Sequence, residues 1–353
     1  MITDYGWSEK LRDTFAPFAK RGLVPARVLV QQRGQLSLVT DAGEMIAELS
    51  GRFVHEADRG EHPVAGDWVA VSVREAEHAA TIHGLVPRSS VFTRKGPTGL
   101  QVVAANVDLA LLTTSLNADF SLRRIERYLA NAYEGGATPI IVLTKADLCD
   151  QVLSLVGQAQ EVAFGVPVLA VSAVTGEGIE ALRAHLLPGL TAVVLGMSGA
   201  GKSTLVNALA GEELMATQGI IADGARGRHT TTHRELIRLP SGALMLDTPG
   251  MREIGVFGAD EGVQAIFADI DEWATQCRFS DCSHHREPGC AIKAAISSGD
   301  LDEARWQSYE KLQKELAFEQ RKEDPVLRAA ARQIWVQRSK NNKVRMKYRG
   351  EGQ

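Results

Sequence analysis

The sequence predicts three structural parts: a small all-β barrel, an α/β domain and a mainly helical C-terminal domain. Between residues 22 and 92, five short β-rich runs are separated by turn residues. From 93 to 262, apolar strands alternate with helical repeats, as an α/β sheet requires. Beyond these, three of the four cysteines cluster within 263–325. We expect a helical extension at 1–21 and a basic tail at 326–353.

Composition indicates a globular protein with several cores. The chain has 353 residues, of which 44% are hydrophobic and 23% charged. Trp7, Leu11, Phe15 and Phe18 have helical spacing, and this start lacks the basic and apolar regions of a signal peptide. No apolar run approaches the length of a membrane span, and the clustered cysteines favour a reducing compartment. We therefore expect a soluble, cytoplasmic protein with no membrane partner.

The C-terminal tail differs in charge from the rest of the chain, whose formal total is −4. Its only acidic residue is Glu351, and it carries Arg328, Arg332, Arg338, Lys340, Lys343, Arg345, Lys347 and Arg349. Such a tail often contacts a polyanion, because neutralising phosphates releases counterions. A solvated tail without a partner is the alternative interpretation.

The barrel is predicted from its strand pattern. The expected strands are 25–32, 36–40, 45–49, 67–73 and 80–86. Five strands in so short a span favour an oligonucleotide-binding (OB) type of barrel, although another small barrel has the same periodicity. A barrel of this kind is as readily a structural spacer as a nucleic-acid module.

A polar connector is expected near 93–101, and the α/β domain follows it. Buried strands are predicted at 107–113, 139–143, 166–171 and 191–195, with helices at 122–133 and 202–209. A hairpin is predicted for residues 234–239 and 243–246, with its turn at Ser241 and Gly242. In the C-terminal domain, helices are expected at 292–296 and 302–318.

The segment GMSGAGKS lies between a predicted strand and a predicted helix, which is the setting of a phosphate-binding loop. Its glycines let backbone N–H groups wrap an anion at the positive end of the helix. Lys202 would reach the β- and γ-phosphates, Ser203 would bind Mg²⁺, and Thr204 extends the first turn toward the α-phosphate. The predicted loop residues are Gly196, Met197, Ser198, Gly199, Ala200, Gly201, Lys202, Ser203 and Thr204.

The segment TKAD predicts that the base is guanine. The Asp147 carboxylate can accept two hydrogen bonds from guanine N1–H and its 2-amino group, donors that adenine lacks. Lys145 would lie along the base, and after Ser172 the Ala173 N–H could meet guanine O6. The usual Asn is replaced by Thr144, which cannot bridge base and phosphate loop with a full amide. We expect guanine selectivity to be retained and affinity to be reduced.

The order of these motifs is itself informative. TKAD and Ser172-Ala173 precede the phosphate loop, whereas in an ordinary GTPase the phosphate loop comes first. Thr230–Thr232 and then DTPG follow it, so all five motifs are present in a permuted order. A compact domain can be reopened at a surface loop without changing its core. The sequence therefore predicts a circularly permuted GTPase whose nucleotide state is linked to the C-terminal region.

Hydrolysis is expected to be slow. Asp247 is the predicted second-shell magnesium group, Gly250 N–H would contact the γ-phosphate, and one threonine of 230–232, taken as Thr231, would complete the metal shell. The position after DTPG is Met251, which cannot orient water. His229 is the candidate that positions water when a partner orders its loop, and an ordinary loop histidine is the alternative.

Cys277, Cys282, His284 and Cys290 have the spacing C-x4-C-x-H-x5-C. This set suits a tetrahedral structural Zn²⁺ with no open position for catalysis. The adjacent His285 could replace His284 as a ligand, and buried free cysteines are the alternative to a metal site.

The permuted order, together with GRHTTTHR, DTPG and CRFSDCSHHREPGCAIKAA, closely resembles the RsgA (YjeQ) family of ribosome small-subunit-dependent GTPases. PVAGDWV at 63–69 and the segment 121–129 also resemble that family. The resemblance implies an OB barrel, a permuted GTPase domain and a zinc domain that act in late maturation of the small ribosomal subunit. We expect a monomer that binds ribosomal RNA and GTP and is released by hydrolysis. The alternatives are a GTP-dependent RNA-binding switch with negligible catalysis and a GTPase with another RNA client.

Overall fold

A computed structural model describes residues 2–32, 35–57, 62–96, 99–117, 120–163, 165–212, 234–247, 260–285 and 287–323. The chain divides into two compact units, Met1–Gly255 and Val256–Gln353.

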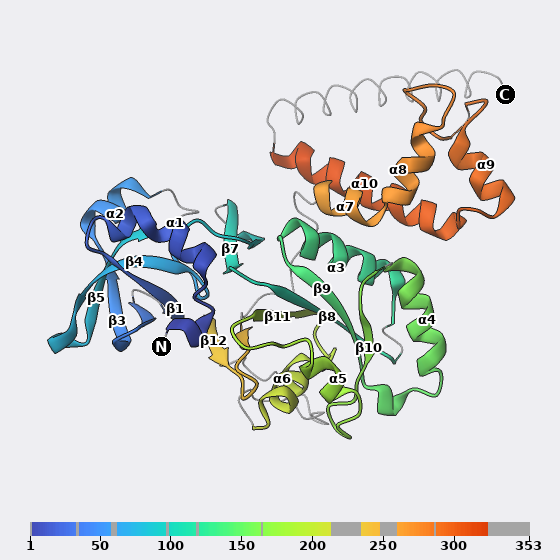
Figure 1. Cartoon of the computed structure of the whole chain (residues 1–353). Coiled ribbons are helices and arrows are strands. Elements are labelled where there is room, and N and C mark those ends of the chain that lie inside the picture. Colours follow the sequence, from blue (N-terminus) through green and yellow to red (C-terminus); the bar gives the residue numbers. More distant parts are fainter. Residues whose placement is uncertain are drawn as a thin grey trace, which may run out of the picture. The chain divides into compact units, whose positions relative to one another are not determined.

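The first unit begins with a closed five-stranded barrel (Figure 1). Its strands pair in the order β1-β2-β3-β5-β4, and an antiparallel β1–β4 pairing closes the ring. Only the β3–β5 pair is parallel among the barrel pairings. The strands are β1 (Val24–Gln32), β2 (Gln35–Thr40), β3 (Gly43–Leu49), β4 (Trp68–Arg74) and β5 (Ala79–Leu85). This closed pattern confirms the predicted OB-type barrel.

Short helices flank the barrel. The N-terminal extension forms η1 (Ile2–Tyr5) and α1 (Glu9–Ala19), and α2 (Gly51–Glu56) follows β3. Ser8 caps α1 by accepting a hydrogen bond from Leu11 N–H. The apolar spacing of this extension is explained by packing, because Trp7 and Phe15 join a buried cluster with Trp68.

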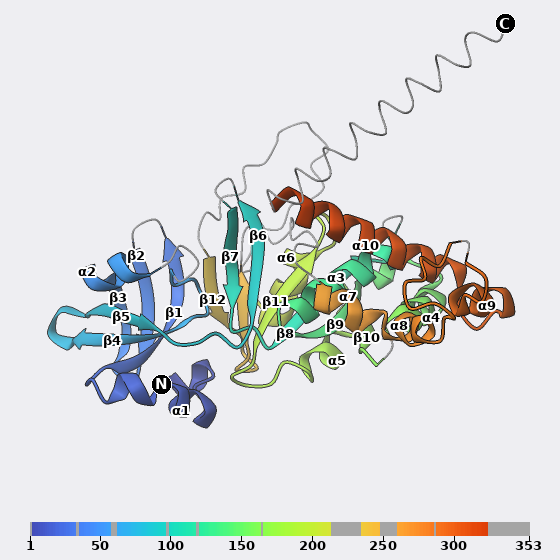
Figure 2. The ribbon, with the colours of Figure 1, turned by 90° about the horizontal axis from the view of Figure 1, so that it is seen from above.

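The expected polar connector at 93–101 is wrong, because this segment forms a hairpin of β6 (Val91–Gly96) and β7 (Gly99–Ala105) (Figure 2). Polar side chains such as Arg94 and Gln101 hid the strand pattern, although they lie on a ladder of backbone hydrogen bonds. The hairpin is anchored by Phe92, which is buried at its base against Gly135.

The α/β sheet is continuous with the barrel. Its order is β10-β9-β8-β11-β13-β12, and β12 pairs antiparallel with β1, so that one sheet has eleven strands. The strands β8 to β11 and β13 are parallel, and β12 forms the predicted hairpin with β13. Their bounds are β8 (Leu109–Ser115), β9 (Thr138–Thr144), β10 (Val168–Ala170), β11 (Thr191–Gly196), β12 (Arg234–Arg238) and β13 (Leu244–Asp247).

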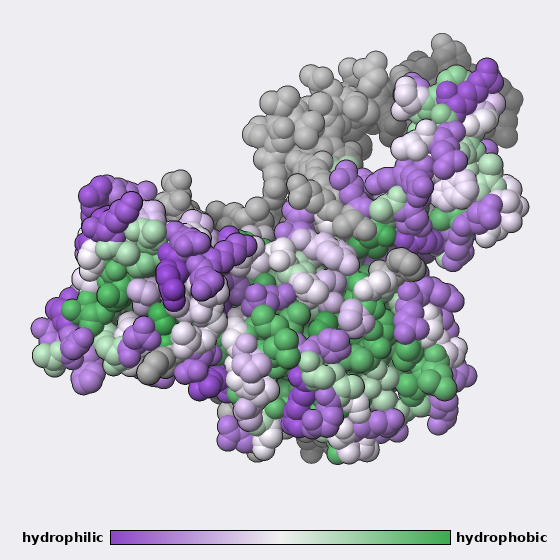
Figure 3. Space-filling view, viewed as in Figure 1, coloured by the Kyte–Doolittle hydropathy of each residue, from purple (hydrophilic) through white to green (hydrophobic). Residues whose placement is uncertain are grey.

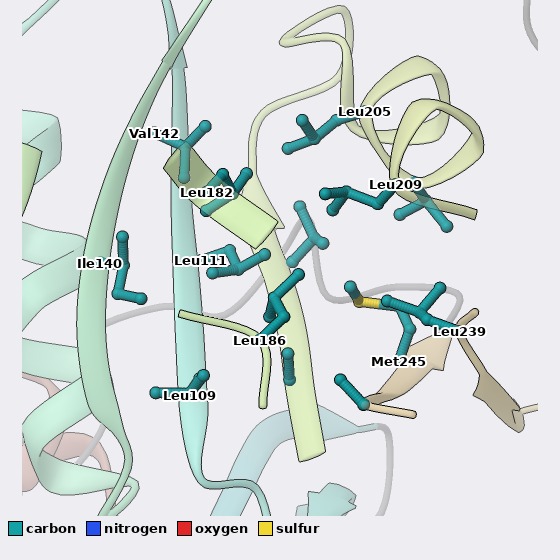
Figure 4. Packing of buried hydrophobic residues seen from close by; sticks show 14 of the residues in the cluster. Leu109, Leu111, Ile140, Val142, Leu182, Leu186, Leu205, Leu209, Leu239 and Met245 are labelled. Atoms are coloured by element: carbon teal, nitrogen blue, oxygen red, sulfur yellow. The ribbon is translucent and has the colours of Figure 1, made fainter. Parts of the chain in front are cut away.

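Helices cover both faces of this sheet (Figure 1). On one side lie α3 (Leu122–Glu134) and α4 (Val152–Val162), and on the other α5 (Ile179–Arg183) and α6 (Lys202–Ala210). Figure 4 shows Leu182, Leu205 and Leu209 packed toward Leu111 and Val142 of the sheet. This apolar core fixes the strand ends from which the site is built.

The second unit is helical in its described residues. It contains α7 (Asp260–Ile266), α8 (Ala268–Thr275), α9 (Ala291–Ser298) and α10 (Glu303–Glu323). Its buried apolar residues include Val263, Phe267, Ile270, Ile292 and Leu312. On the face shown in Figure 3, hydrophilic residues are interspersed with apolar ones. Within the described residues, no helix is both long and apolar enough to cross a membrane.

Candidate functional site

Three predicted motifs lie at the same edge of the α/β sheet. Thr144 ends β9, Gly196 ends β11, and Ser172 follows β10 closely. These strands are parallel, so their carboxyl ends lie together at one edge. In open α/β sheets, ligands bind at this edge.

The phosphate loop begins at a position that only glycine can occupy. Gly196 has a φ of +154°, and a Cβ there would lie 2.6 Å from the carbonyl oxygen of Thr113. The Thr113 hydroxyl also donates to the Leu195 carbonyl at 2.7 Å, which fixes the end of β11 against β8. Local sequence patterns do not point to Thr113, because its partner is 82 residues away.

The remainder of the loop is open toward solvent. Met197, Ser198 and Gly199 are exposed, whereas Ala200 is buried. Lys202 donates from Nζ to the carbonyl oxygens of Gly196 and Met197, at 2.7 and 2.6 Å. Ser203 and Thr204 follow in the first turn of α6, where backbone N–H groups lack helical partners. The loop therefore has the donors and the cation that a phosphate chain needs.

The TKAD segment is joined directly to the phosphate loop. The Thr144 hydroxyl donates to the carbonyl oxygen of Ala200 at 2.6 Å, and both groups are buried. Lys145 has a left-handed backbone, with φ of +60°, and Asp147 is exposed in the short helix η4 (Ala146–Leu148). Thr144 thus makes the hydrogen bond to the phosphate loop that was expected of the asparagine amide in the usual motif. A hydroxyl has one proton, so this bond leaves no second donor for a base.

The segment after β10 lies against TKAD. Ala146 N–H donates to the Val171 carbonyl at 3.1 Å, which places Ser172 and Ala173 beside Asp147 in the fold. Ser172 is buried, and its hydroxyl accepts a hydrogen bond from Thr175 N–H at 3.1 Å. The structure therefore brings together the phosphate loop, TKAD and the Ser172–Ala173 pair.

The predicted hydrolytic residues are only partly described. Asp247 ends β13, whose residue Leu246 is in register with Val193 of β11, so Asp247 lies near the start of the phosphate loop. His229, Thr230–Thr232, Gly250 and Met251 lie outside the described residues.

The four predicted metal ligands converge in space. The donor atoms of Cys277, Cys282, His284 and Cys290 all lie within 4.8 Å of one another. The Nδ1 atom of His284 lies 3.5 Å from the Cys277 sulfur and 3.6 Å from the Cys290 sulfur. Ala291 N–H donates to the Cys277 sulfur at 3.3 Å. Burial opposes ionisation of Cys277, but amide and thiol hydrogen bonds lower its pKa, whereas burial and the neighbouring thiols raise the pKa of Cys282 to about 11.

His285 lies outside the group of converging ligand atoms and contacts a carboxylate instead. Its Nε2 atom lies 3.3 Å from a carboxylate oxygen of Glu310 on α10, so the structure favours His284 as the ligand. Two residues that the sequence did not point to support the cluster. The carboxylate of Glu287 accepts hydrogen bonds from Ser283 and from His285 N–H, and the Trp306 ring lies edge-on to His284. Trp306 is distant in sequence, so spacing could not reveal it.

The PVAGDWV segment forms a buried junction between the barrel and the α/β sheet. Arg27 of β1 is 2% exposed and donates to the carbonyls of Gly66 and Asn106 and to the Thr191 hydroxyl. Burial lowers the pKa of Arg27 to about 10, so it stays charged at neutral pH. Asp67 accepts two hydrogen bonds from Arg88, at 2.8 and 2.7 Å. Burial raises the pKa of Asp67, and Arg88 opposes this rise.

The fold and the site together define a circularly permuted P-loop GTPase. The base-recognition strands β9 and β10 precede the phosphate loop in the chain, yet they pair in one parallel sheet around it. Comparison with known proteins gives the particular family. The model of the RsgA GTPase family matches residues 85–257.

Relatives match along nearly the whole chain. A protein of Opitutus terrae named small ribosomal subunit biogenesis GTPase RsgA is 43% identical and aligned over 99% of both chains. A protein of Streptomyces coelicolor with the same name is 45% identical, over 99% of this chain and 96% of that one. The chain therefore belongs to the RsgA family, as the sequence motifs predicted.

Solved structures have the same fold. YjeQ from Thermotoga maritima is 27% identical, with a TM-score of 0.64 over 83% of this chain and 98% of that chain. YloQ, described as a circularly permuted GTPase, is 24% identical, with a TM-score of 0.61 over 83% of this chain and 95% of that chain. The second similarity concerns the fold alone.

Proposed function

We propose that this protein binds the small ribosomal subunit and hydrolyses GTP during late maturation of that subunit. The observation that carries the proposal is identity of 43% along 99% of a protein named for small ribosomal subunit biogenesis. The adjoining phosphate loop and TKAD segment support GTP as the nucleotide. The site acts in the cytoplasm, in a monomer.

In this proposal, each loop contributes a separate part of nucleotide recognition. The backbone N–H groups from Gly196 to Thr204 hold the phosphates, and Lys202 turns from its own loop toward the β- and γ-phosphates. Asp147 reads the guanine edge from its exposed position, while the aliphatic part of Lys145 covers the base. Ser203 and Thr231 would bind the Mg²⁺ directly, with Asp247 acting from its second shell, and the ion would neutralise phosphate charge.

Hydrolysis depends on a partner. Met251 supplies no hydrogen bond to water, so turnover without a partner is slow. We assign the positioning of water to His229 and the contact with the γ-phosphate to Gly250 N–H. Release of the protein follows hydrolysis, with residues 219–232 and 247–255 as the segments that respond to GTP.

The cysteine cluster is assigned to one structural zinc ion. Three sulfurs and one imidazole nitrogen within 4.8 Å are the donor set that zinc prefers. The four donors fill a tetrahedral shell, so the site contributes to folding rather than to catalysis. The OB-type barrel and the C-terminal unit, which precede and follow the GTPase domain in the chain, bind ribosomal RNA. The basic tail adds RNA affinity.

The experiment that tests this function is GTP hydrolysis by the purified protein, alone and with small ribosomal subunits, with ATP as the control nucleotide. Strong stimulation by the small subunit and none with ATP is expected. GTP binding without stimulation would contradict the catalytic part of the proposal. If the small subunit does stimulate hydrolysis, His229→Ala should lose the stimulated rate while keeping normal nucleotide affinity.

The role of Thr144 is tested by GDP affinity. Thr144→Val removes the hydroxyl and leaves the buried Ala200 carbonyl without its partner, so affinity should fall by about five- to tenfold. Thr144→Asn should tighten GDP binding, because an amide can reach both the loop and the base. No tightening in Thr144→Asn would refute the expected cost of threonine.

A further inference from the structure

One aromatic ring of the C-terminal unit is presented to solvent. Phe279 is 40% exposed and is the one exposed large hydrophobic side chain among the described residues of this unit. Three other described rings of this unit contact one another, since the buried Phe267 contacts Tyr309, which contacts Trp306, and Trp273 is only partly exposed. An exposed ring is ordinary by itself, so its surroundings decide whether it has a role.

Arg278 lies over this ring. Its guanidinium carbon is 5.5 Å from the ring centroid of Phe279. Among the described residues, the Arg278 side chain makes no ion pair and no hydrogen bond. Both members of the pair are exposed, so the stacked guanidinium and ring together present a flat surface to solvent.

A second arginine–phenylalanine pair in the same unit shows the contrast. Arg305 lies over Phe267 at 4.9 Å, but Asp269 accepts two hydrogen bonds from it, at 2.8 and 2.7 Å. Arg305 also donates from Nη2 to the Ile266 carbonyl, so its Nε and Nη2 donors bind within the fold, and its ring partner is buried. That pair stabilises the unit, whereas the Arg278–Phe279 pair has no such internal bonds.

The exposed pair is held in place by the cysteine loop. Arg278 N–H donates to the Gly289 carbonyl at 3.1 Å, and Cys282 N–H donates to the Phe279 carbonyl at 3.3 Å. Gly289 has a φ of +75°, and a Cβ there would meet Arg278 Cβ at 3.1 Å, so the arginine stem packs closely on it. Cys277 and Cys282 bracket the pair in sequence, which fixes the backbone at both ends once the cluster is formed.

We propose that Arg278 and Phe279 form a stacking platform for an unpaired nucleobase of RNA. Unstacked RNA bases are commonly bound on aromatic rings and on arginine guanidinium planes. A preordered pair loses little conformational entropy on binding. The exposed Asp281 is close by in sequence, and its negative charge offsets that of Arg278. We therefore expect base stacking to contribute more to RNA binding than attraction to phosphates does, and RNA affinity to depend only modestly on salt. The platform would be one contact of the proposed ribosomal RNA interface, and it rests on that proposed function.

The test uses the full-length, zinc-loaded protein and a short unstructured oligoribonucleotide that contains 2-aminopurine. Stacking quenches the fluorescence of this base, so quenching reports the platform directly. Phe279→Ala should abolish quenching and weaken binding about tenfold, the size expected for one stacked base. Phe279→Trp should restore both, and Arg278→Lys should weaken binding less, because it keeps the charge but loses the plane.

Lys293→Ala is the matched control, because it removes one exposed positive charge of the same unit on α9. It should leave quenching unchanged. Zinc content and thermal unfolding of each variant show whether the unit is intact. Equal binding by Phe279→Ala and Lys293→Ala, or no quenching by the wild-type protein, would overturn the platform.

The two experiments distinguish failure of the platform from failure of the proposed function. If small subunits stimulate GTP hydrolysis but Phe279→Ala binds RNA like the wild-type protein, the platform is wrong and the function stands. If subunits do not stimulate hydrolysis but Phe279→Ala still loses quenching, the platform stands and the ribosomal function is wrong.

Discussion

The two units of this chain satisfy their buried polar groups in different ways. In the first unit, Arg27 donates to the Gly66 carbonyl and Arg88 donates to the Asp67 carboxylate. These bonds lie between two large apolar cores. In the second unit, three sulfurs and one imidazole nitrogen converge within 4.8 Å of one another, beside a small helical core. The first arrangement is complete in the protein alone, whereas we propose that a metal ion completes the second. The following changes test this contrast.

Removal of the metal should have the largest effect. A chelator, or Cys290→Ser, should unfold the C-terminal unit, because structural zinc sites contribute about 10 kcal/mol or more to folding. Hydrogen exchange should show loss of protection in α9 and retained protection in β11. Cys149→Ser is the control, since Cys149 lies outside the cluster. Equal loss of protection in both units would contradict the contrast.

Arg27→Met should have the next largest effect. The change leaves the carbonyls of Gly66 and Asn106 and the Thr191 hydroxyl without this donor in a buried site. The free energy of unfolding of the first unit should fall by about 3–5 kcal/mol. Arg74→Met is the control, because Arg74 makes an exposed ion pair with Glu77, and it should cost at most about 1 kcal/mol. Urea unfolding followed by hydrogen exchange in β4 measures both.

These two networks also differ in how far the sequence predicted them. The metal ligands were found because they are close in sequence and of a recognisable chemical type. The Arg27 junction was missed, because Arg27 and Thr191 are 164 residues apart and neither has an unusual local context. The barrel strands were predicted from their alternation, whereas Arg94 and Gln101 concealed the β6–β7 hairpin. Local patterns therefore predicted elements and ligands, but not contacts made by folding distant segments together.

Gly66→Ala tests the junction through the backbone alone. Gly66 has a φ of +92°, and a Cβ there would lie 2.6 Å from the Ala105 carbonyl oxygen, which belongs to β7 and cannot move easily. Gly43→Ala is the control, since Gly43 also has positive φ, +110°, but no atom lies within 4 Å of the added Cβ. Backbone strain should lower the free energy of unfolding by about 1–3 kcal/mol in both variants, and Gly66→Ala should lower it more than Gly43→Ala. Equal melting temperatures would show that the junction can relax.

The smallest effect is expected for the Asp269–Arg305 pair of the C-terminal unit. Burial opposes ionisation of Asp269, but hydrogen bonds and charge from Arg305 lower its pKa. The stabilising contribution is therefore present above the unfolded pKa of about 3.9 and is lost as pH falls through the lower folded pKa. Because the carboxylate is 46% exposed, solvent screening limits the contribution to about 1 kcal/mol.

Asp269→Asn should lower the free energy of unfolding of the C-terminal unit near neutral pH by that amount. The difference from the wild-type protein should begin to shrink below the unfolded pKa of about 3.9 and should vanish only below the lowered folded pKa, where the wild-type carboxyl is also neutral. Loss of the metal would itself unfold this unit, so metal content is measured at each pH and only pH values at which both proteins keep the metal are compared. Glu272→Gln neutralises an exposed carboxylate on the same helix and should show a smaller difference. A difference that persists undiminished in acid would mean that Asp269 acts through shape rather than charge, and the metal cluster would then be the main electrostatic element of this unit.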